Sequence, residues 1–471
     1  MRQLAVVVLA AGEGTRMKSE IPKVLHEIAG LPLIGHVLAT AHSLSANHVV
    51  AVLRHKKADI EGYVAEHFPQ TLIAEQDDIP GTGRAVEAAI DALPKGFDGD
   101  LLVLSGDVPL LDTQSIGELV ARHREANNAA TLVSCELDDP NGYGRIVRSG
   151  GALKEIVEQK DADAEQLAVT EVNAGVYCFD GPALKEALAR VTTDNAQKEK
   201  YLTDVAAIML EAGKGVQAHV ISDHWLVAGI NDRVQLSEVA AELNRRIVRA
   251  WQLAGVTVLE PNSTLIDVTV QLGQDVLLKP STRLHGLTRV GPGSVIGPDT
   301  TLRDTEVGSG ANIVRTHAEG ARVHDGATVG PFSYLRPGTE LGAGAKIGAF
   351  VETKNAKIHT GAKVPHLSYV GDAEIGEGAN IGAGTIFANY DGENKHRSTV
   401  GKHAKTGSGN VFVAPVNIGA GAYTAAGSTI RRDVEPGALA LNTTPQKNLA
   451  GWVLEKRPGS DSAKAASEET E

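Results

Sequence analysis

A small-residue loop follows the first apolar run of the chain and could bind a phosphate. Residues 6–17 read VVVLAAGEGTRM, so apolar residues lead into a loop that Arg16 closes, and Lys23 follows in IPKVLH. Backbone N–H groups and two cations could hold a triphosphate and stabilise charge that develops during phosphoryl transfer. The loop lacks the Gly-Lys-Ser/Thr of a Walker A motif, and Met17 replaces the third glycine of a dinucleotide-binding fingerprint. A glycine-rich turn without function is the alternative interpretation.

A carboxylate follows another apolar run. In LSGDVPLL, residues 104–111, Asp107 comes directly after the apolar stretch. At the carboxyl end of a strand in an open α/β sheet, such a residue faces the ligand cleft. Mg²⁺ binds through few protein oxygens together with phosphates, so Asp107 is a candidate magnesium ligand. A turn-forming aspartate is the alternative interpretation.

A second group of polar residues lies in the C-terminal half, where it interrupts a regular repeat. Its members are Arg336 in YLRPG, Lys354 in FVETKNA, His366 and Tyr369 in PHLSYVGD, Asn380 in GANIGAG, and Asn389 and Tyr390 in FANYDGENK. Histidine titrates near neutral pH, which suits a general base. Interruptions cost stability, so a functional reason is expected there.

Two other functions are open for this C-terminal region. It could serve only as a trimerisation scaffold. It could also bind zinc through three histidines at a subunit interface, as a γ-carbonic-anhydrase-like hydratase would. Histidines are available for this purpose, but none of their spacings stands out: His317, His324, His359, His366, His396 and His403. We therefore do not favour the zinc site.

The elements that position the first loop alternate between strands and helices. Strand-like runs cover 5–9, 48–53, 100–107, 129–135 and 174–179, and helix-like stretches cover 81–93 and 116–127. Such alternation predicts a mostly parallel sheet with helices on both faces, a Rossmann-like α/β domain over residues 1–233. An amphipathic stretch at 237–252 predicts a linker helix over 234–254. The polar segment 456–471 predicts a disordered tail.

A six-residue period replaces this alternation over residues 255–455. Apolar residues recur at every sixth position in three runs: Val323, Val329, Leu335, Leu341 and Ile347; Ile358, Val364 and Val370; and Val400, Phe412, Ile418 and Ile430, with Thr406 and Thr424 in the same series. Hexapeptide repeats are typical of a left-handed parallel β-helix, in which each repeat is one short strand and one corner.

Charge and composition exclude some classes of protein. The formal net charge is −13, so no positive field gathers a nucleic acid. No apolar run reaches membrane-spanning length. Cys135 and Cys178 lie in apolar stretches and provide no disulfide framework. These features predict a cytoplasmic protein that binds neither nucleic acid nor membrane.

Several motifs together resemble one enzyme family. LAAGEGTRM, PKVLH, EQ…GTGRAV, SGDVPLL, NGYGRIV, IVEQKDA, EVNAGVY and GIND occur in this order over residues 9–232. They are similar to the motifs of sugar-1-phosphate nucleotidyltransferases. With the hexapeptide region, the chain resembles the bifunctional glucosamine-1-phosphate N-acetyltransferases and N-acetylglucosamine-1-phosphate uridyltransferases.

The resemblance implies two reactions, which together make UDP-N-acetylglucosamine for the synthesis of peptidoglycan. The C-terminal domain would acetylate glucosamine-1-phosphate with acetyl-CoA. The N-terminal domain would transfer UMP from UTP to N-acetylglucosamine-1-phosphate, releasing pyrophosphate, with Mg²⁺ as cofactor. A homotrimer is also implied. The alternative is a single-activity sugar-1-phosphate nucleotidyltransferase with a trimerising β-helix.

For the uridyl site, the resemblance implies residues that bind UTP and the UDP-sugar: Leu9, Ala10, Ala11, Gly12, Arg16, Lys23, Gln76, Gly81, Thr82, Gly144, Glu158, Asn173 and Asn231. The backbone around Ala11 and Gly12, with Arg16 and Lys23, would hold the phosphates. Gln76, Gly81 and Thr82 would read the uracil edge, and Gly144, Glu158 and Asn173 would hold the sugar. Asp107 and Asn231 would ligate Mg²⁺. Arg84 replaces the usual family histidine and receives no role.

For the acetyl site, the resemblance implies His366 as the general base, with Glu352 orienting its ring. Glucosamine-1-phosphate would be bound by Arg336, Lys354, Tyr369 and Asn380. Acetyl-CoA would be bound by Ala383, Asn389, Tyr390, Lys395, Ser408 and Ala426. The family often has a basic residue near position 443 that meets the coenzyme A phosphates, and this chain has Thr443.

Overall fold

The computed structural model describes residues 2–442 and 445–469. The chain divides into two compact units. The first comprises residues 1–254, 261–270 and 284–286, and the second comprises the remaining residues. The position of Thr443, where the family often has a basic residue, lies outside the described residues.

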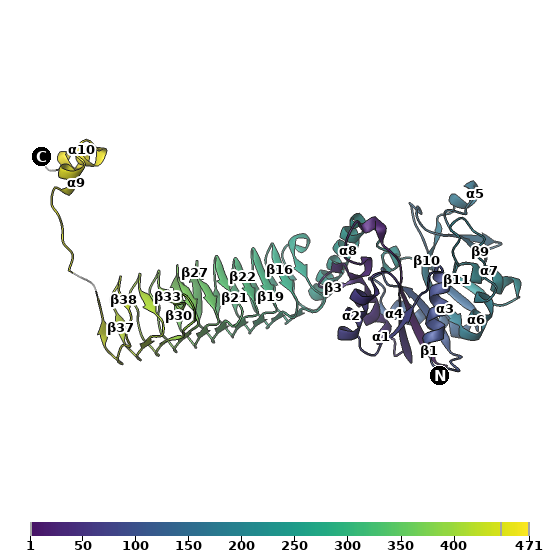
Figure 1. Cartoon of the computed structure of the whole chain (residues 1–471), viewed down its shortest axis with the longest axis horizontal. Helices are drawn as coiled ribbons and strands as arrows, with labels where there is room; N and C mark the ends of the chain where they lie inside the picture. Colours follow the sequence, from purple (N-terminus) through teal and green to yellow (C-terminus); the bar gives the residue numbers. More distant parts are fainter. Residues whose placement is uncertain (1, 443–444, 470–471) are drawn as a thin grey trace. The chain divides into compact units, whose positions relative to one another are not determined.

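The first unit is built on a mixed sheet (Figure 1). Its strand order is β11 (Val216–Ile221), β7 (Ala130–Glu136), β10 (Glu171–Asp180), β6 (Asp100–Ser105), β1 (Leu4–Ala10), β4 (His48–Leu53) and β5 (Leu72–Glu75). Strand β1 pairs in parallel with β4 and β6, whereas β10 runs antiparallel to both β6 and β7. The mostly parallel α/β sheet that the sequence predicts is therefore confirmed.

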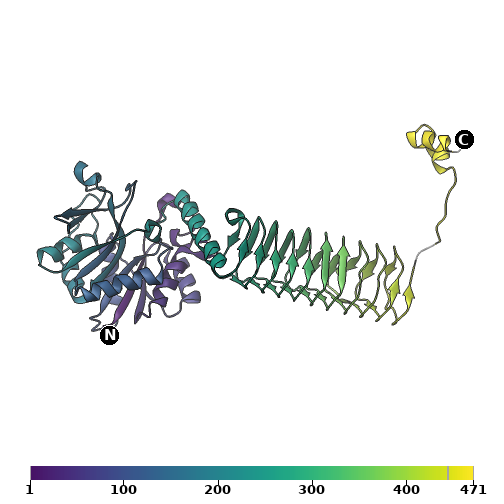
Figure 2. The same cartoon turned by 180° about the vertical axis from the view of Figure 1, so that it is seen from behind.

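Helices cover both faces of this sheet, and each face has its own apolar core (Figure 2). Residues of β1 alternate between the two cores, because successive side chains of a strand point to opposite faces. On one face lie α3 (Thr82–Ala92), α6 (Gly181–Leu188) and α7 (Asp204–Glu211); on the other lie α1 (Leu33–Ser43), α2 (Lys57–His67) and α4 (Thr113–Glu125). The buried strands explain the continuous apolar runs in the sequence.

Two elements complete this unit. A hairpin of β8 (Arg145–Ser149) and β9 (Ala152–Val157) joins the sheet where Arg145 pairs with Val172 of β10. The helix expected over 237–252 is α8 (Arg233–Leu253), and the Asp232 carboxylate caps it by accepting hydrogen bonds from the N–H groups of Val234 and Gln235.

The second unit is a stack of coils whose short strands form three parallel sheets (Figure 1). One sheet contains β12 (Thr257–Val258), β15 (Leu277–Leu278), β18 (Val295–Ile296), β21 (Asn312–Ile313), β24 (Thr328–Val329), β27 (Lys346–Ala349) and β30 (Lys363–His366). The second includes β19 (Thr300–Arg303), β22 (Thr316–Glu319), β25 (Ser333–Leu335), β28 (Glu352–Lys354), β31 (Tyr369–Gly371), β33 (Ile386–Ala388), β35 (Val411–Val413) and β38 (Thr429–Ile430). The third contains β14 (Gln271–Leu272), β17 (Arg289–Val290), β20 (Glu306–Val307), β23 (Arg322–Val323), β26 (Glu340–Leu341), β29 (Lys357–Ile358), β32 (Ala373–Ile375), β34 (Ser398–Val400) and β36 (Asn417–Ile418).

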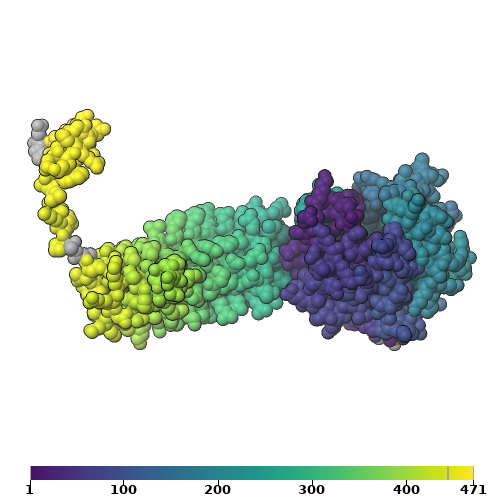
Figure 3. Space-filling view, viewed as in Figure 1, coloured from purple at the N-terminus to yellow at the C-terminus, as the bar shows by residue number. Residues whose placement is uncertain are grey.

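The six-residue period corresponds to the inside of these coils. Every residue of the three predicted runs is buried, including Thr406 and Thr424. Figure 3 shows the coils of this region packed closely against one another. At Gly348, within β27, a Cβ atom would collide with the backbone of Pro365 in the next coil, so this position requires glycine. This is the architecture of a left-handed parallel β-helix, and the predicted fold is confirmed.

The C-terminal tail differs from the disorder expected over 456–471. The structure has α10 (Asp461–Glu468) within this segment, and α9 (Trp452–Lys456) ends where the segment begins. Ser460 caps α10, because its Oγ accepts a hydrogen bond from the N–H of Ala463 at 3.2 Å, and Ala and Glu in the helix favour helix formation. Within the described residues, the structure has no helix both long and apolar enough to span a membrane.

Candidate active sites

Nine of the predicted nucleotide-binding and metal-binding residues line one hollow of about 420 Å³ in the first unit. They are Leu9, Ala10, Ala11, Gly12, Lys23, Gln76, Gly81, Thr82 and Asp107. The hollow lies where β1, β4 and β6 end, which is where an open α/β sheet binds its ligand. Arg16 does not line the hollow; it is exposed in the short helix η1 (Thr15–Met17).

Sequence reasoning missed other residues that line the same hollow. Arg54 and His55 follow β4 directly, and Ser105 ends β6, so the strand-end rule could have found them. Glu199 also lines the hollow, from a segment without regular structure. No motif at Glu199 announces this position.

Two predicted metal ligands converge on one positive charge. The Lys23 ammonium makes an ion pair with the Asp107 carboxylate and donates a hydrogen bond to Asn231 Oδ1 at 3.2 Å. Asn231 is fixed in turn, since its N–H donates to Gln235 Oε1 at 2.7 Å. The Asp107 carboxylate and the Asn231 amide oxygen both contact the Lys23 ammonium, and oxygens of these two types are ligands that fit Mg²⁺. The residues present are therefore suited to the metal.

The predicted uracil-reading residues form a tight turn. Gln76 is buried, and its side-chain Nε2 donates hydrogen bonds to the carbonyl oxygens of Ile79 and Gly81 at 2.9 and 3.1 Å. Its backbone N–H donates to Leu53 O at the end of β4. The turn therefore closes on itself and remains anchored to the sheet.

The predicted sugar-holding residues form a second group. The N–H of Asn173 donates to Gly144 O at 2.9 Å, and a Cβ atom on Gly144 would lie 3.6 Å from Glu158 Oε2. Glu158 accepts a hydrogen bond from Thr203 Oγ1 at 3.2 Å. Burial raises the pKa of Glu158 above the ordinary glutamate value, although the Thr203 hydroxyl opposes the shift. Thr203 is a further neighbour that the sequence analysis did not identify.

In the second unit, neighbouring strands of one sheet bring several predicted residues together. Arg336 follows β25, Glu352 begins β28, and Tyr369 begins β31 in register with Glu352. Arg336 Nη1 donates to Glu352 Oε1 at 2.9 Å. The Glu352 carboxylate thus pairs with Arg336, not with the His366 ring that it was expected to orient. The strand register places Glu352 opposite Tyr334, and Arg336 lies two residues beyond Tyr334, on the same face.

Two ammonium groups approach each other beside this set. The neighbouring Lys395, together with partial desolvation, lowers the pKa of Lys354. Asp372 lies close by and accepts a hydrogen bond from Asn389 Nδ2. Cations that repel one another in the free protein are stabilised when an anion binds between them. The arrangement is therefore suited to a phosphate.

The remaining predicted acetyl-site residues lie on successive coils. His366 ends β30 with an exposed side chain, and Asn380 forms parallel bridges with Lys363 of β30 and with Lys405 in the next coil. The Tyr369 hydroxyl and Asn389 amide both pack over Gly371, where a Cβ atom would collide with them. Tyr390 and Lys395 pair across the loop that interrupts the repeat at 388–399.

A stripe of small residues follows one corner of the later coils. Gly409 N–H donates to Ala383 O at 2.7 Å, and Gly427 N–H donates to Ser408 O at 2.9 Å. Ala426 packs against Gly407 in the neighbouring coil. Ala383, Ser408 and Ala426 therefore occupy equivalent corners, and their small side chains leave room for an elongated ligand.

Comparisons with known proteins agree with both units. Residues 6–207 match the model of the MobA-like NTP transferase domain, and residues 320–355 match the bacterial transferase hexapeptide (six repeats). The chain is 59% identical to the bifunctional protein GlmU of Clavibacter sepedonicus, over 99% of this chain and 94% of that protein. It is 56% identical to the protein of the same name from Kineococcus radiotolerans, over 98% and 94%. It is 54% identical to that of Streptomyces avermitilis, over 99% and 97%.

Proposed function

This chain belongs to the family of bifunctional GlmU proteins, and from that premise we propose that it makes UDP-N-acetylglucosamine in two steps. It is a bifunctional transferase, with acetyl transfer assigned to the second unit and uridyl transfer to the first. The observation that carries the proposal is that the two predicted residue sets assemble in separate units, nine of the first set around one hollow. The product would supply the synthesis of peptidoglycan.

Uridyl transfer needs positioning and charge neutralisation, and no covalent intermediate on the protein. A phosphate oxygen of N-acetylglucosamine-1-phosphate attacks the α-phosphorus of UTP in line, and pyrophosphate leaves. Lys23 and the N–H groups of Ala11 and Gly12 would hold the phosphates. Asp107 and Asn231 would hold Mg²⁺, which supplies positive charge against the phosphate oxygens when bound. Gln76 and the turn after it would select uracil.

Acetyl transfer needs a neutral amine. His366 would accept a proton from the 2-amino group of glucosamine-1-phosphate as its nitrogen attacks the thioester carbonyl of acetyl-CoA. The carbon–sulfur bond then breaks, and the coenzyme A thiolate leaves and takes up a proton. Arg336 and Lys354 would bind the sugar phosphate, and the small-residue stripe that includes Ser408 would accommodate coenzyme A.

A full reaction mixture tests this proposal. Purified protein with glucosamine-1-phosphate, acetyl-CoA, UTP and Mg²⁺ should yield UDP-N-acetylglucosamine, free coenzyme A and pyrophosphate in equal amounts, measured by chromatography. Omission of acetyl-CoA should stop the formation of UDP-N-acetylglucosamine, and addition of N-acetylglucosamine-1-phosphate should restore it. If a nucleotide sugar formed from glucosamine-1-phosphate and UTP at the same rate with and without acetyl-CoA, the result would contradict the proposal and favour a single-activity nucleotidyltransferase.

We also propose a homotrimer, because one edge of the β-helix is apolar and exposed. Phe332, Phe350 and Leu367 occupy equivalent corners of successive coils and are 53%, 58% and 61% exposed. The rings of Phe332 and Phe350 stack with centroids 5.2 Å apart. We call these three residues the apolar ridge. Contiguous exposed apolar surface of this kind typically marks an interface.

The third sheet of the β-helix has the opposite character. Glu306, Arg322, Glu340, Lys357 and Glu374 pair in register along it, so that opposite charges alternate from strand to strand. We call this row the charged ladder. Its members compensate one another in the single chain, so this face suits solvent and the apolar ridge is the better interface.

Replacement of Phe350 with glutamate should convert the trimer to monomers in light scattering. Each buried phenylalanine contributes about 1.5–3 kcal/mol, and the substitution removes that term at every interface while introducing charge. Leu367 of the apolar ridge adjoins His366, so acetyl transfer should fall with the trimer while uridyl transfer persists. Lys357→Gln on the charged ladder is the control and should remain trimeric. An intact trimer of the Phe350 variant would contradict the assignment of the interface.

The raised pKa of Glu158 predicts a pH dependence of sugar binding. A carboxylate accepts hydrogen bonds from sugar hydroxyls, and a raised pKa means that this form is lost at a higher pH than for an ordinary glutamate. KM for N-acetylglucosamine-1-phosphate should therefore rise as the pH falls toward that pKa, while KM for UTP changes less. Steady-state kinetics of Glu158→Gln should show a higher KM for N-acetylglucosamine-1-phosphate, and this KM should lack the pH dependence. If the KM of that variant changed with pH as it does in the wild type, the assignment of Glu158 to sugar binding would be contradicted.

A further inference from the structure

Arg84, to which the sequence analysis gave no role, connects the proposed uracil-reading turn to helix α3. Its Nε lies 3.1 Å from each oxygen of the Asp77 carboxylate, and its Nη2 lies 2.6 Å from Asp77 Oδ2. Asp77 follows Gln76 directly, and its Oδ1 accepts a hydrogen bond from the N–H of Ile79 at 3.1 Å. Arg84 therefore holds the acidic residue that shapes the start of the turn.

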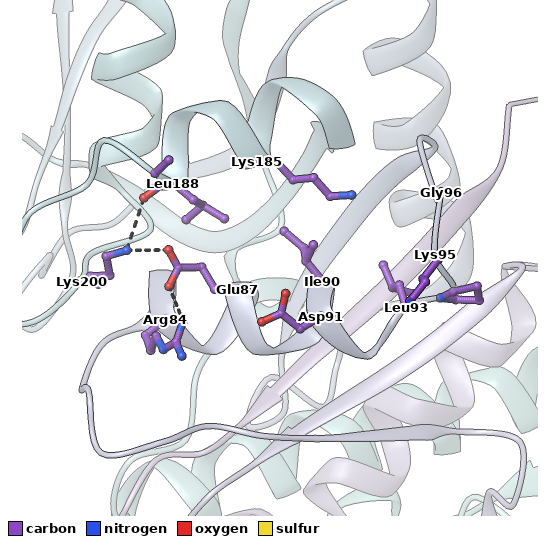
Figure 4. Close-up of a pocket in the computed structure, with 12 residues that line it drawn as sticks. Arg84, Glu87, Ile90, Asp91, Leu93, Lys95, Gly96, Lys185, Leu188 and Lys200 are labelled. Atoms are coloured by element: carbon purple, nitrogen blue, oxygen red, sulfur yellow. Dashed lines mark hydrogen bonds and ion pairs between the residues drawn. The ribbon is translucent and has the colours of Figure 1, made fainter.

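The same guanidinium continues into a second ion pair, shown in Figure 4. Arg84 Nη1 donates to Glu87 Oε2 at 2.8 Å, and Lys200 Nζ donates to Glu87 Oε1 at 2.5 Å. Lys200 Nζ also reaches Leu188 O at the end of α6, at 3.4 Å. Glu87 thus joins Arg84 to the segment that contains Lys200.

Backbone hydrogen bonds fasten this segment to the other end of the turn. The N–H of Lys200 donates to Pro80 O at 3.0 Å, and the N–H of Gly83 donates to Lys200 O at 2.8 Å. A Cβ atom on Gly81 would collide with the Lys200 backbone, so the two backbone segments are in close contact. The segment also supplies Glu199 to the hollow and Thr203 to Glu158.

The ion pair between Arg84 and Asp77 is charged around neutral pH. Hydrogen bonds from Arg84 lower the pKa of Asp77, and the two carboxylates raise the pKa of Arg84. The side chains of Arg84, Glu87 and Lys200 are 27%, 19% and 20% exposed, so solvent screens them only in part. A planar guanidinium that binds two carboxylates fixes geometry better than an ammonium could.

We propose that Arg84 is a positioning residue for recognition of the nucleotide base. Arg84 bridges Asp77 to Glu87 and Lys200, and so holds residues 76–82 against residues 200–202. This contact keeps Gln76, Gly81 and Thr82 at the spacing that reads a pyrimidine edge. The inference rests on the proposed uridyl transfer and adds a residue that acts through the turn. Figure 4 shows Arg84, Glu87 and Lys200, which form part of the bridge. Arg84 and Lys200 are the sequence neighbours of Ala85 and Glu199, which line the hollow.

Steady-state kinetics of Arg84→Ala test the proposal. KM for UTP should rise about tenfold and kcat should change less than about threefold, since residues of one hydrogen-bond and ion-pair network are energetically coupled. The ratio of kcat/KM for UTP to that for CTP should fall, because a loosened turn discriminates less. Arg84→Lys should recover only part of the loss. Glu87→Gln, which preserves side-chain shape, should shift KM in the same direction by a smaller factor.

Controls separate this inference from the function on which it rests. Arg190→Ala removes an exposed ion pair with Glu211 in the same unit and should leave KM and base selectivity unchanged. Wild-type protein without any uridyl transfer would overturn the proposed function itself. Active wild type with an unchanged UTP KM in both Arg84→Ala and Glu87→Gln would overturn the role of Arg84 alone. Equal losses for UTP and CTP with a lowered Tm would also overturn it, since these indicate stability and not positioning.

Discussion

Replacement of His366 with alanine should reduce acetyl transfer by about 10²–10⁴-fold, the usual contribution of a general base, and should leave uridyl transfer within a few fold. The side chain is exposed at the end of β30, so its removal leaves no cavity in the β-helix core. Thiol release from acetyl-CoA measures the first activity, and pyrophosphate release from UTP and N-acetylglucosamine-1-phosphate measures the second.

His359→Ala provides a matched control for this substitution. His359 is exposed in the same unit and pairs with Glu374 at 2.8 Å on the third sheet, away from the proposed acetyl-site strands. Its loss should leave both activities within about twofold, as is usual for a surface substitution. Loss of both activities in His366→Ala would mean that His366 supports the fold, and full acetyl transfer would mean that another group accepts the proton.

Replacement of Asp107 with alanine should reduce uridyl transfer by about 10³-fold or more, because it removes the proposed charged metal ligand and the partner of Lys23. Acetyl transfer should persist, since its residues lie in the other unit. Pyrophosphate release across a Mg²⁺ titration measures the effect. Asp107→Asn should retain some activity and require more Mg²⁺ for half-maximal rate.

Asp59→Ala is the control for this second substitution, because Asp59 is an exposed carboxylate on α2 of the same unit. It should leave both rates and the Mg²⁺ requirement unchanged. Near-normal turnover by Asp107→Ala, at the Mg²⁺ concentration that saturates the wild type, would contradict the assignment of the metal ligand.

The features that sequence predicts well are those that repeat or that follow from burial. The six-residue period identifies inward-facing residues of the β-helix, such as Leu335 and Ile347, because the large aliphatic position of each repeat points inward. The apolar runs that contain Val7 and Val103 identify the central strands, because these strands are covered on both faces. Asp107 is found by the same logic, since it follows such a run.

The features that sequence misses depend on contacts between distant segments. The apolar residues of the β8–β9 hairpin form only short stretches, such as those at 146–147 and 156–157, and the hairpin joins the sheet through β10, so no local periodicity predicts it. The Arg84 bridge requires that residue 200 return to residue 80, which no local pattern specifies. The resemblance implies that Glu352 orients His366, whereas strand register places Glu352 opposite Tyr334 and its carboxylate accepts a hydrogen bond from Arg336.

The central claim, that two enzymes share one chain, is tested most directly by an acetyl-transfer assay without UTP. The purified protein would be given glucosamine-1-phosphate and acetyl-CoA alone, and free thiol would be followed over time. We expect thiol release that depends on the sugar phosphate and disappears in His366→Ala. No release, from a preparation that still transfers UMP to N-acetylglucosamine-1-phosphate, would contradict the account and make the β-helix a trimerising scaffold.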